Sequence, residues 1–479
     1  MERDADLVKR RLDKTTEEKT KLEEQLAEVT KERNALQRKA EAMGEMGAEM
    51  EKLRETAERV PELEKEAKAK EKEAEEAIAL YKKEQVLRKQ YWNMMEDMRG
   101  KIRVFCRCRP TSKSEAEKGC KEVVSFPDGF TIDLDTPKGK KSFVYDGVYG
   151  PASTQEQIFE DMERLSMSAF DGYNVALFAY GQTGSGKTFS MTGSPDMPGV
   201  TPRTIDTLFR LKEEKKGEFD VTISSYFVEI YLDHLQDLYW RVDHGRKSKE
   251  TPPKLDVKKD SKGMVFIRNS VIKKAESGEE LMEQFNAGNS MRKVGSTKMN
   301  ADSSRSHSIF AIMIEARNKS TKKVARGKLS LIDLAGSERV AKTGATADRL
   351  REGTAINKSL SALGNVISAL TSDSGGHIPY RDNILTQVMS DSLGGQAKTV
   401  MLVCLSPVDY NVEESVTSLV YASRVKLITN TAKKTEESAE VARLKKIIAK
   451  LKAGEAVDED AEDIDDSGGA ASGGGKGKG

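Results

Sequence analysis

The fold of this 479-residue chain is decided by the stretch Gly181-Gln182-Thr183-Gly184-Ser185-Gly186-Lys187-Thr188. It fits the pattern G-x-x-x-x-G-K-[ST] and follows an apolar run, 175–180, that is typical of a buried β-strand. The glycines let backbone N–H groups converge on phosphates at the positive N-terminus of the next helix. Lys187 should reach the β- and γ-phosphates of a nucleotide, and Thr188 should place its hydroxyl on Mg²⁺. A chance glycine-rich turn is the alternative, but the preceding strand and the complete motif argue against it.

A second stretch, residues 329–338, supplies the partner that such a phosphate loop needs. Its apolar, strand-like run ends at Asp333, which can hold the Mg²⁺ shell. Gly336 follows closely and can offer its N–H to the γ-phosphate. Together with the phosphate loop, this stretch indicates a nucleoside triphosphate site that uses Mg²⁺.

A third stretch, residues 300–307, carries small hydroxyl side chains beside an arginine. Ser303, Ser304 and Arg305 could read a γ-phosphate and its metal ion. Taken alone, the segment would be interpreted as a polar surface loop. Beside the two stretches described above, we interpret it as a third part of the nucleotide site.

Composition excludes several classes of function. The hydrophobic fraction is 37%, the charged fraction 33% and the formal net charge +1, so we expect no nucleic-acid partner. No run approaches the roughly 20 apolar residues that cross a bilayer, so we expect no direct membrane insertion. The four cysteines have no paired spacing and there is no signal peptide, which predicts reduced thiols and a cytoplasmic protein.

Residues 1–99 are predicted to form a coiled-coil stalk and neck. They are rich in Glu, Lys, Arg, Ala and Leu, and one heptad phase contains Leu12, Leu22, Leu26, Val29 and Leu36. Residues 43–47 interrupt this phase, and a shifted phase contains Met50, Leu53, Ala57 and Val60, before Pro61. A last run contains Leu80, Glu84, Leu87, Tyr91, Met94 and Met98. We interpret the pattern as a homodimeric coiled coil. A single charged surface helix is the alternative, but a lone polar helix has little to stabilise it.

Residues 100–430 form the predicted globular part. Composition changes at Gly100, residues 101–109 alternate like a strand, and apolar strands then alternate with helical patterns. This order predicts an α/β fold. Residues 431–454 form a basic amphipathic regulatory segment. Residues 455–479 are acidic and then rich in Gly and Ser, which predicts disorder.

Taken together, these segments resemble the kinesin motor domain. The stretch 303–307 is similar to the family's switch I, 333–338 to its switch II, and Arg107-Cys108-Arg109-Pro110 to its adenine-contacting motif. Residues 380–382 and 391–395 fit later signatures, so the resemblance spans roughly residues 100–430. It implies a P-loop NTPase with a central sheet flanked by helices on both faces, preceded by the coiled coil. It also implies ATP and ADP as ligands, Mg²⁺ as cofactor, and a microtubule-stimulated ATPase of the cytoskeleton, in spindle or cortical arrays.

The resemblance assigns roles to single residues. Three of them would hold Mg²⁺ or its shell: Thr188, Ser304 and Asp333. Ser303 and Gly336 would contact the γ-phosphate. A salt bridge between Arg305 and Glu338 would close behind the attacking water. Phosphoryl transfer needs positioning and charge stabilisation more than covalent chemistry, which agrees with this set. A γ-phosphate could order both loops and release them on hydrolysis.

A track-binding face is predicted between residues 334 and 391. The resemblance places this stretch against the acidic microtubule surface, where binding should be sensitive to salt. The expected contacts are Lys342, Arg349, Arg351, Lys358 and Arg381. Ordinary solvated charge is the alternative. Residues 383–387 carry Asn, Ile and Gln where many kinesins carry Lys and Arg, so we expect weaker binding.

The order of the parts suggests a direction of movement. The coiled coil precedes the motor and meets it at residues 98–104, with Gly100 at the junction. This arrangement resembles the minus-end-directed class of kinesins, in which the neck helix swings as a lever. The direction follows from the resemblance and not from composition.

Residues 439–452 form a basic amphipathic pattern that suits the apolar groove of a calmodulin-like protein. The residues expected to bind are Val441, Arg443, Leu444, Lys446, Ile447, Ile448 and Leu451. A short helix packed on the motor is the alternative. Neck and tail resemble a calmodulin-binding class of plant and green-algal kinesins, which implies regulation by Ca²⁺ through calmodulin or a related EF-hand protein, and further N-terminal domains. The acidic run 455–466 is either solvated or folds onto the track-binding face.

Three functions compete at this point. A microtubule-stimulated ATPase motor is favoured. A slow or ATP-regulated microtubule cross-linker is the alternative, because residues 383–387 add little positive charge. The phosphate loop and both switches argue against a simple tether, which needs no γ-phosphate sensor. A generic P-loop NTPase with a coiled coil is a third interpretation. The segments 303–307 and 380–382 argue against it.

Overall fold

The computed structural model describes residues 2–43, 58–78, 80, 81, 84, 100–245, 250–292, 304–338, 347–372 and 376–437. The chain divides into two compact units, Met1–Arg99 and Gly100–Gly479. The division falls where the composition changes from heptad-like to mixed apolar and polar. Among the described residues, no helix is long and apolar enough to span a bilayer.

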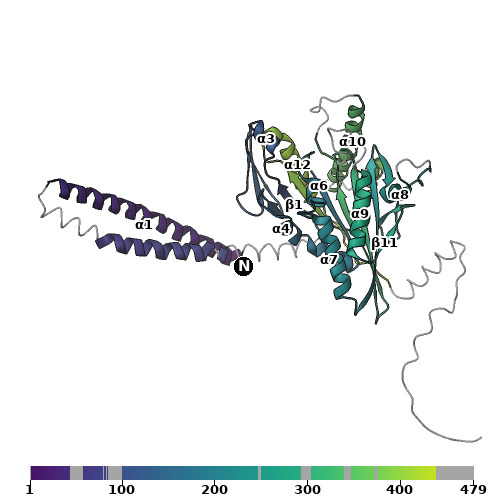
Figure 1. The fold of residues 1–479 in the computed structure, drawn as a ribbon, viewed down its shortest axis with the longest axis horizontal. Helices are drawn as coiled ribbons and strands as arrows, with labels where there is room; N and C mark the ends of the chain where they lie inside the picture. The colour runs from purple at the N-terminus through teal and green to yellow at the C-terminus, as the bar shows by residue number, and fades with distance from the viewer. Residues whose placement is uncertain are drawn as a thin grey trace, which may run out of the picture. The chain divides into compact units, whose positions relative to one another are not determined.

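Within its described residues, the first unit contains two helices that run in opposite directions beside each other (Figure 1). They are α1 (Glu2–Met43) and the helix over 58–78, which is followed by helical residues 80, 81 and 84. Of the predicted heptad residues, Val29 and Val60 are buried, and Leu80 is 58% exposed. Leu12, Leu22 and Leu26 are half-buried. Met50, Leu53 and Ala57 lie outside the described residues, as does the side chain of Leu36.

The second unit is built on a mixed β-sheet that has ten strands within the described residues. The main path runs in the order β11-β7-β12-β13-β6-β14-β1-β5, with β8 beside β7 and β15 beside β13. The strands are β1 (Arg103–Cys108), β5 (Gly147–Tyr149), β6 (Asn174–Tyr180), β7 (Phe219–Tyr231), β8 (His234–Asp237), β11 (Lys273–Ala275), β12 (His307–Asn318), β13 (Val324–Asp333), β14 (Lys398–Leu405) and β15 (Glu436–Glu437). Two small sheets add β2 (Val124–Ser125), β3 (Thr131–Thr136) and β4 (Gly139–Val144), and β9 (Asp256–Lys259) with β10 (Val265–Arg268).

Helices cover both faces of the main sheet, as the sequence predicted (Figure 1). Side chains of β6 alternate between two hydrophobic cores. Val175 and Leu177 join one core, and Phe178 and Tyr180 join the other. The first core includes residues of α4 (Gln155–Glu160), α5 (Glu163–Phe170), α7 (Val200–Glu214) and α9 (Gly278–Arg292). The second includes residues of α10 (Ala347–Leu370), α11 (Ile384–Val388) and α12 (Val412–Val425). Shorter helices are α3 (Lys113–Glu117), α6 (Lys187–Met191), α8 (Leu238–His244), η4 (Tyr380–Asp382), η5 (Met389–Asp391) and η6 (Asp409–Asn411).

Strand direction brings the predicted nucleotide motifs to one edge of the sheet. β6 pairs in parallel with β13 and with β14, and β14 pairs in parallel with β1. The segments that follow β6, β13 and β1 therefore leave the sheet at the same edge. β12 is antiparallel to β13, so its first residue, His307, starts there as well. Ligands of α/β sheets bind at this carboxyl edge.

A buried ion pair ties the sheet to the segment after α11. Lys328 Nζ lies 2.8 Å from Asp391 Oδ2, and both side chains are almost fully buried. Asn174 Nδ2 and the backbone N–H of Val265 also donate to that carboxylate, at 2.8 and 2.9 Å. Burial by itself would raise the pKa of Asp391, but Lys328 and these donors hold it below its usual range. The buried negative charge of Asp391 is therefore stabilised by contacts from three strands, β13, β6 and β10.

Replacing the cation of this pair should destabilise the second unit strongly. Lys328→Met leaves Asp391 buried without its counter-ion, so we expect the free energy of unfolding to fall by about 3–5 kcal/mol. Urea unfolding followed by intrinsic fluorescence measures the change. Lys323→Met is the matched control, because Lys323 is 57% exposed and lies 3.8 Å from Glu436. That variant should lose at most about 1 kcal/mol. Equal losses in the two variants would contradict the assignment.

Candidate functional site

The phosphate loop joins β6 to α6 in the geometry that the motif predicts. Gly184 and Gly186 have φ angles of 77° and 100°, in the left-handed region that glycine adopts readily. Lys187 is 5% exposed, and its Nζ donates to the carbonyl oxygens of Gly181 and Gln182 at 2.8 and 2.9 Å. Burial lowers the pKa of Lys187, while Asp333 and Glu338 act against that shift. The loop therefore holds a buried lysine at the start of a helix, where a phosphate group would meet it.

Asp333 stands at the end of β13 and faces the phosphate loop. Thr188 Oγ1 donates to Asp333 Oδ2 at 2.8 Å, so two of the three predicted magnesium residues are in contact. Asp333 Oδ1 is buried and has no hydrogen-bond partner among the described residues. Hydroxyl and carboxylate oxygens are the donors that Mg²⁺ prefers. A buried carboxylate oxygen without a partner beside such a hydroxyl fits the metal that the motif implies.

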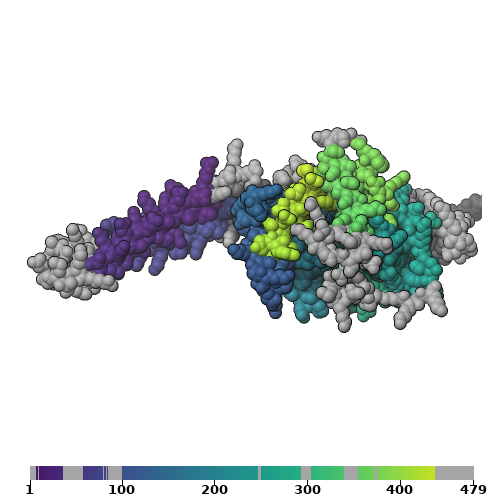
Figure 2. All heavy atoms as spheres, turned by 90° about the horizontal axis from the view of Figure 1, so that it is seen from above, coloured from purple at the N-terminus to yellow at the C-terminus, as the bar shows by residue number. Residues whose placement is uncertain are grey.

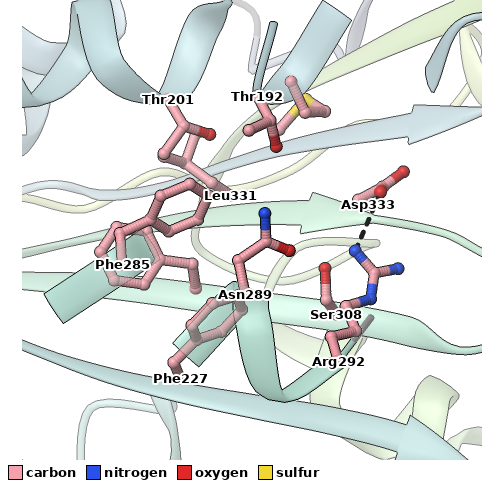
Figure 3. Close-up of a pocket in the computed structure, with 11 residues that line it drawn as sticks. Thr192, Thr201, Phe227, Phe285, Asn289, Arg292, Ser308, Leu331 and Asp333 are labelled. Atoms are coloured by element: carbon pink, nitrogen blue, oxygen red, sulfur yellow. Dashed lines mark hydrogen bonds and ion pairs between the residues drawn. The ribbon is translucent and has the colours of Figure 1, made fainter. Parts of the chain in front are cut away.

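Arg292, at the end of α9, is a site residue that the sequence analysis missed. Its Nη1 lies 3.1 Å from Asp333 Oδ2 (Figure 3). Its Nη2 donates to the carbonyl of Ser306 at 3.1 Å. Its Nε is 3.8 Å from Glu229 Oε1, and the arginine side chain is 3% exposed. The arginine therefore bridges the switch I segment and the carboxylate of Asp333, which is predicted to bind the metal. Nothing in the sequence near residue 292 forms a motif that could have identified it.

A small cavity lies behind Asp333 and Arg292. Its volume is ≈ 10 Å³, and its lining includes Phe227, Phe285 and Leu331 on the side away from Asp333 (Figure 3). A cavity of this size holds about one water molecule. Asp333 and Arg292 line the polar end of the cavity, so a water molecule there would hydrogen-bond to the carboxylate of Asp333.

The two switch segments meet each other and the phosphate loop. The Gly336 N–H donates to the carbonyl of Ser304 at 2.9 Å, and the Ser337 N–H donates to the carbonyl of Gly181 at 3.1 Å. Glu338 accepts from the Thr183 N–H at 2.8 Å and from its hydroxyl at 2.5 Å. The predicted salt bridge between Glu338 and Arg305 stays a prediction. Ser303 lies outside the described residues.

The glycine at position 336 lies close to the contact between Glu338 and Thr183. A Cβ at this position would lie 2.3 Å from both Glu338 Oε2 and Thr183 Oγ1. A larger residue would therefore force the ends of these two side chains to move out of their present contact.

His307 connects the site to α10. Its Nδ1 accepts from the backbone N–H of Ala335 at 3.0 Å, and its Nε2 lies 2.8 Å from Ser359 Oγ on α10. Burial, with help from Arg292 and Lys187, lowers the pKa of His307 to about 3. The imidazole is therefore neutral, and because Nδ1 accepts, Nε2–H donates to Ser359. One side chain thus links switch I, switch II and a helix of the predicted track-binding face.

The predicted adenine-contacting motif divides into two environments. Arg109 Nε donates to the carbonyl of Gly184 at 2.7 Å, and its guanidinium pairs with Glu115 at 2.6 Å. Hydrogen bonds from Arg109 lower the pKa of Glu115 to about 2. Arg107 points into the protein instead, where it donates to Gln155 and Ser190 at 2.8 and 2.9 Å. Arg109 thus lies beside the phosphate loop and also donates to the carbonyl of Pro110, while Arg107 contacts Ser190 of α6 from inside the protein.

The predicted track-binding residues are only partly described. Lys358, on α10, pairs with Asp233 at 3.3 Å, and Arg381 is exposed. Arg349 and Arg351 lie on α10 with side chains outside the described residues, and Lys342 lies outside them altogether. In Figure 2 the green part of the chain, which includes the segment after α10, lies at the surface.

Asp233 was not singled out from the sequence, yet it joins three elements. It sits in the turn between β7 and β8, where Leu232 and Asp233 have φ angles of 51° and 60°. Its Oδ1 accepts from Asn383 Nδ2 at 2.7 Å, at the start of α11. Its Oδ2 faces Lys358. The turn therefore holds a carboxylate against both helices of this face.

The chain after α12 lies on the second unit as far as residue 437. The N–H groups of Thr431 and Thr435 donate to the carbonyls of Gly395 and Gly172, both at 2.8 Å, and β15 pairs with the start of β13. The backbone N–H of Asn430 donates to the carbonyl of Gly100 at 2.7 Å. All seven residues predicted to bind calmodulin lie outside the described residues, as does the acidic run.

Comparison with known proteins agrees with this geometry. The kinesin motor domain family matches residues 107–428. The kinesin-like protein KIN-14I of Oryza sativa subsp. japonica is 49% identical over 389 residues, which are 80% of this chain and 31% of that protein. KIN-14E of Arabidopsis thaliana is 48% identical over 371 residues, 77% of this chain and 29% of that protein. The chain spans about a third of the length of these curated relatives.

Solved structures share the fold. A fast kinesin has a TM-score of 0.65 and 36% identity, over 71% of this chain and 94% of its own. A KIF14 dimer, solved with AMP-PNP in complex with a microtubule, has a TM-score of 0.66 and 33% identity, over 72% of this chain and 99% of its own. The family match covers more than half of the chain and falls on the elements that build the site, so the chain belongs to the kinesin family.

Proposed function

We propose that this chain is an ATP-hydrolysing motor that is stimulated by microtubules and works in the cytoplasmic cytoskeleton. The observation that carries the proposal is the contact of His307 with Ala335 and Ser359. It joins both switch segments to α10, which lies on the expected track-binding face. A nucleotide site connected in this way to a surface helix suits a protein that must report the state of its nucleotide to a partner.

The residues of the site have distinct tasks in this reaction. Thr188, Ser304 and Asp333 would hold Mg²⁺, which neutralises charge on the phosphates when bound. Lys187 leaves its loop carbonyls to contact the β- and γ-phosphates, and Arg292 keeps Asp333 oriented. Positioning of this kind supplies most of the catalysis in phosphoryl transfer.

Glu338 and Gly336 would respond to the γ-phosphate. In the structure the Gly336 N–H donates to Ser304, and Glu338 accepts from Thr183. A γ-phosphate would compete for the Gly336 N–H and draw switch II toward it. Glu338 would then turn from Thr183 toward Arg305 and close the site around the attacking water. His307 would carry this rearrangement to Ser359 on α10.

Removing the carboxylate of Glu338 should separate binding from hydrolysis. We expect Glu338→Ala to bind ATP and to lose at least about 100-fold in kcat, since the attacking water loses its positioning group. Steady-state ATPase rates with and without microtubules, beside nucleotide binding, measure this. Glu160→Ala, at an exposed glutamate of α4, is the control and should behave like the unmodified chain. Normal turnover of Glu338→Ala would contradict the role, and an unmodified chain that microtubules do not stimulate would favour the cross-linker.

Freeing Lys358 should strengthen microtubule binding. Asp233 competes with the acidic track for this lysine, so Asp233→Asn should lower the Kd for microtubules by roughly two- to fivefold at low salt. Asparagine keeps an acceptor for Asn383 and tolerates the left-handed turn. Cosedimentation measures the Kd, and the gain should shrink at high salt. Asp135→Asn, on β3, is the control. Unchanged affinity of the Asp233→Asn variant would contradict a contact between Lys358 and the microtubule.

The finer features of the motor are also proposals. We propose minus-end-directed movement by a dimer whose neck swings at Gly100, and control by Ca²⁺–calmodulin binding to residues 439–452. The hydrogen bonds from Ile102 to Ile428 and from Asn430 to Gly100 support this, because they join the start of the motor to the chain leading to the tail.

A gliding assay on polarity-marked microtubules tests both features at once. We expect movement with the plus end leading, because a fixed minus-end motor pushes filaments that way, and a change of speed when Ca²⁺ and calmodulin are added together. A chain that ends at residue 437 is the control and should not respond to calmodulin. Filaments moving with the minus end leading would contradict the direction. An equal response of the shortened chain would contradict the tail site.

A further inference from the structure

The guanidinium of Arg109 uses all of its N–H groups within the protein. Nε donates to the carbonyl oxygen of Gly184 at 2.7 Å. Nη1 donates to the carbonyl of Pro110 at 2.8 Å and to Glu115 Oε2 at 2.7 Å. Nη2 donates to Glu115 Oε1 at 2.6 Å and to Ser406 Oγ at 3.3 Å. Because an arginine side chain has five N–H donors, each of them has an acceptor here and none is left for a nucleotide.

The carboxylate of Glu115 is held from several sides. Besides the two bonds from Arg109, it accepts from the N–H and the hydroxyl of Ser112, at 2.9 and 2.8 Å. The Ser406 hydroxyl and Asn411 Nδ2 donate to Oε1 at 3.1 and 3.2 Å. Ser112 is the N-cap of α3, and the other two residues lie between β14 and α12. Glu115 is therefore anchored to two parts of the unit that are far apart in sequence, and it faces the guanidinium with both oxygens.

The phosphate loop needs such a contact from outside because its glycines leave it free. Gly184 and Gly186 both have positive φ angles, and no side chain restricts their backbone. Arg109 lies against both of them. Its Nε bonds to the Gly184 carbonyl, and a Cβ built on Gly186 would lie 4.0 Å from the Cβ of Arg109. The arginine therefore follows the part of the loop that has the least conformational restriction of its own.

The bond to the Gly184 carbonyl also fixes the next N–H group. In a planar trans peptide the C=O and the N–H point in opposite directions, so the peptide between residues 184 and 185 turns as one plane. On its other edge the Ser185 N–H donates to the carbonyl of Gln182 at 3.2 Å. The guanidinium of Arg109 thus holds the central turn of the phosphate loop.

We propose that Glu115 is a positioning residue of the nucleotide site and acts on the phosphate loop through Arg109. The carboxylate fixes the plane of the guanidinium, and the guanidinium fixes the Gly184 carbonyl. The loop is then held in one shape before a nucleotide binds. Arg109 serves the nucleotide through the loop and not by donating a hydrogen bond to it. The inference rests on the ATP site of the proposed function.

Removing the charge of Glu115 should weaken nucleotide binding more than catalysis. Glu115→Gln keeps the shape of the side chain but replaces one acceptor oxygen by an NH₂ group. We expect the Kd for the fluorescent analogue mant-ADP and the KM for ATP to rise roughly tenfold, since the nucleotide must now order the loop. The kcat at saturating ATP and microtubules should change less than about twofold, because Thr188, Asp333 and Glu338 are untouched. Fluorescence titration and steady-state ATPase rates measure this split.

The matched control is another well-covered carboxylate that pairs with a cation. Asp133, on β3, lies 2.8 Å from Lys140, and its side chain is 8% exposed, against 11% for Glu115. Asp133→Asn should leave Kd and KM unchanged. If Glu115→Gln lowers thermal stability but also leaves Kd and KM unchanged, its role is structural and the inference is overturned. An unmodified chain that does not bind mant-ADP would contradict the proposed function and, with it, this inference.

A double-mutant cycle tests the route through Arg109. Arg109→Met removes the contact with Gly184, so adding Glu115→Gln to that variant should change the Kd for mant-ADP by less than a further twofold or so. Effects that multiply in the double variant would reveal a separate route and overturn the inference.

A milder variant covers the case in which these changes prevent folding. Ser406→Ala removes one partner from Arg109 and one from Glu115 but leaves their ion pair in place. It should raise the Kd for mant-ADP roughly two- to threefold, with kcat unchanged. An unaltered Kd in this variant would also contradict the proposal.

Discussion

The carboxylate of Asp333 is the contact on which the rest of the motor unit depends. A buried carboxylate needs donors, and this one draws them from two helices far apart in the chain, Thr188 on α6 and Arg292 on α9. β13 holds it at the edge of the sheet, between the phosphate loop and switch I. Its second oxygen remains without a partner among the described residues, at the place where the motif predicts a metal ion. The sheet, the phosphate loop and the predicted metal site thus meet at one side chain.

From this point hydrogen bonds, in addition to the apolar packing of α10 on the core, connect the site to the surface. His307 accepts from Ala335 and donates to Ser359, so its orientation is fixed from both sides. Burial keeps the ring neutral, which this pattern of one acceptor and one donor requires. A movement of switch I or switch II must therefore either move α10 or break a buried hydrogen bond, and the second costs about 1–3 kcal/mol. This cost gives the nucleotide a physical means of moving a surface helix.

Charged pairs differ between the two units. In the motor unit, Lys328 and Asp391 are almost completely buried and hold strands together through a network of donors. In the first unit, Lys19 and Lys70 are about a quarter exposed and pair with Glu71 and Glu18 of the facing helix. Their individual contributions to stability are small in such surroundings.

The sequence by itself determined the parts of the protein whose geometry is local. The loop 181–188 and the segment 333–338 obey rules that act within a few residues, and the boundary at Gly100 follows from composition. The heptads likewise revealed that α1 has a seam, but they cannot say which helix fills it, since any partner with matching spacing would serve. Only the tertiary structure decided that Arg292 faces Asp333, that Asp233 holds Lys358, and that Glu71 faces Lys19. These contacts join residues 41 to 125 positions apart in the chain, and such pairs are brought together by strand order and chain reversal, which no local pattern encodes.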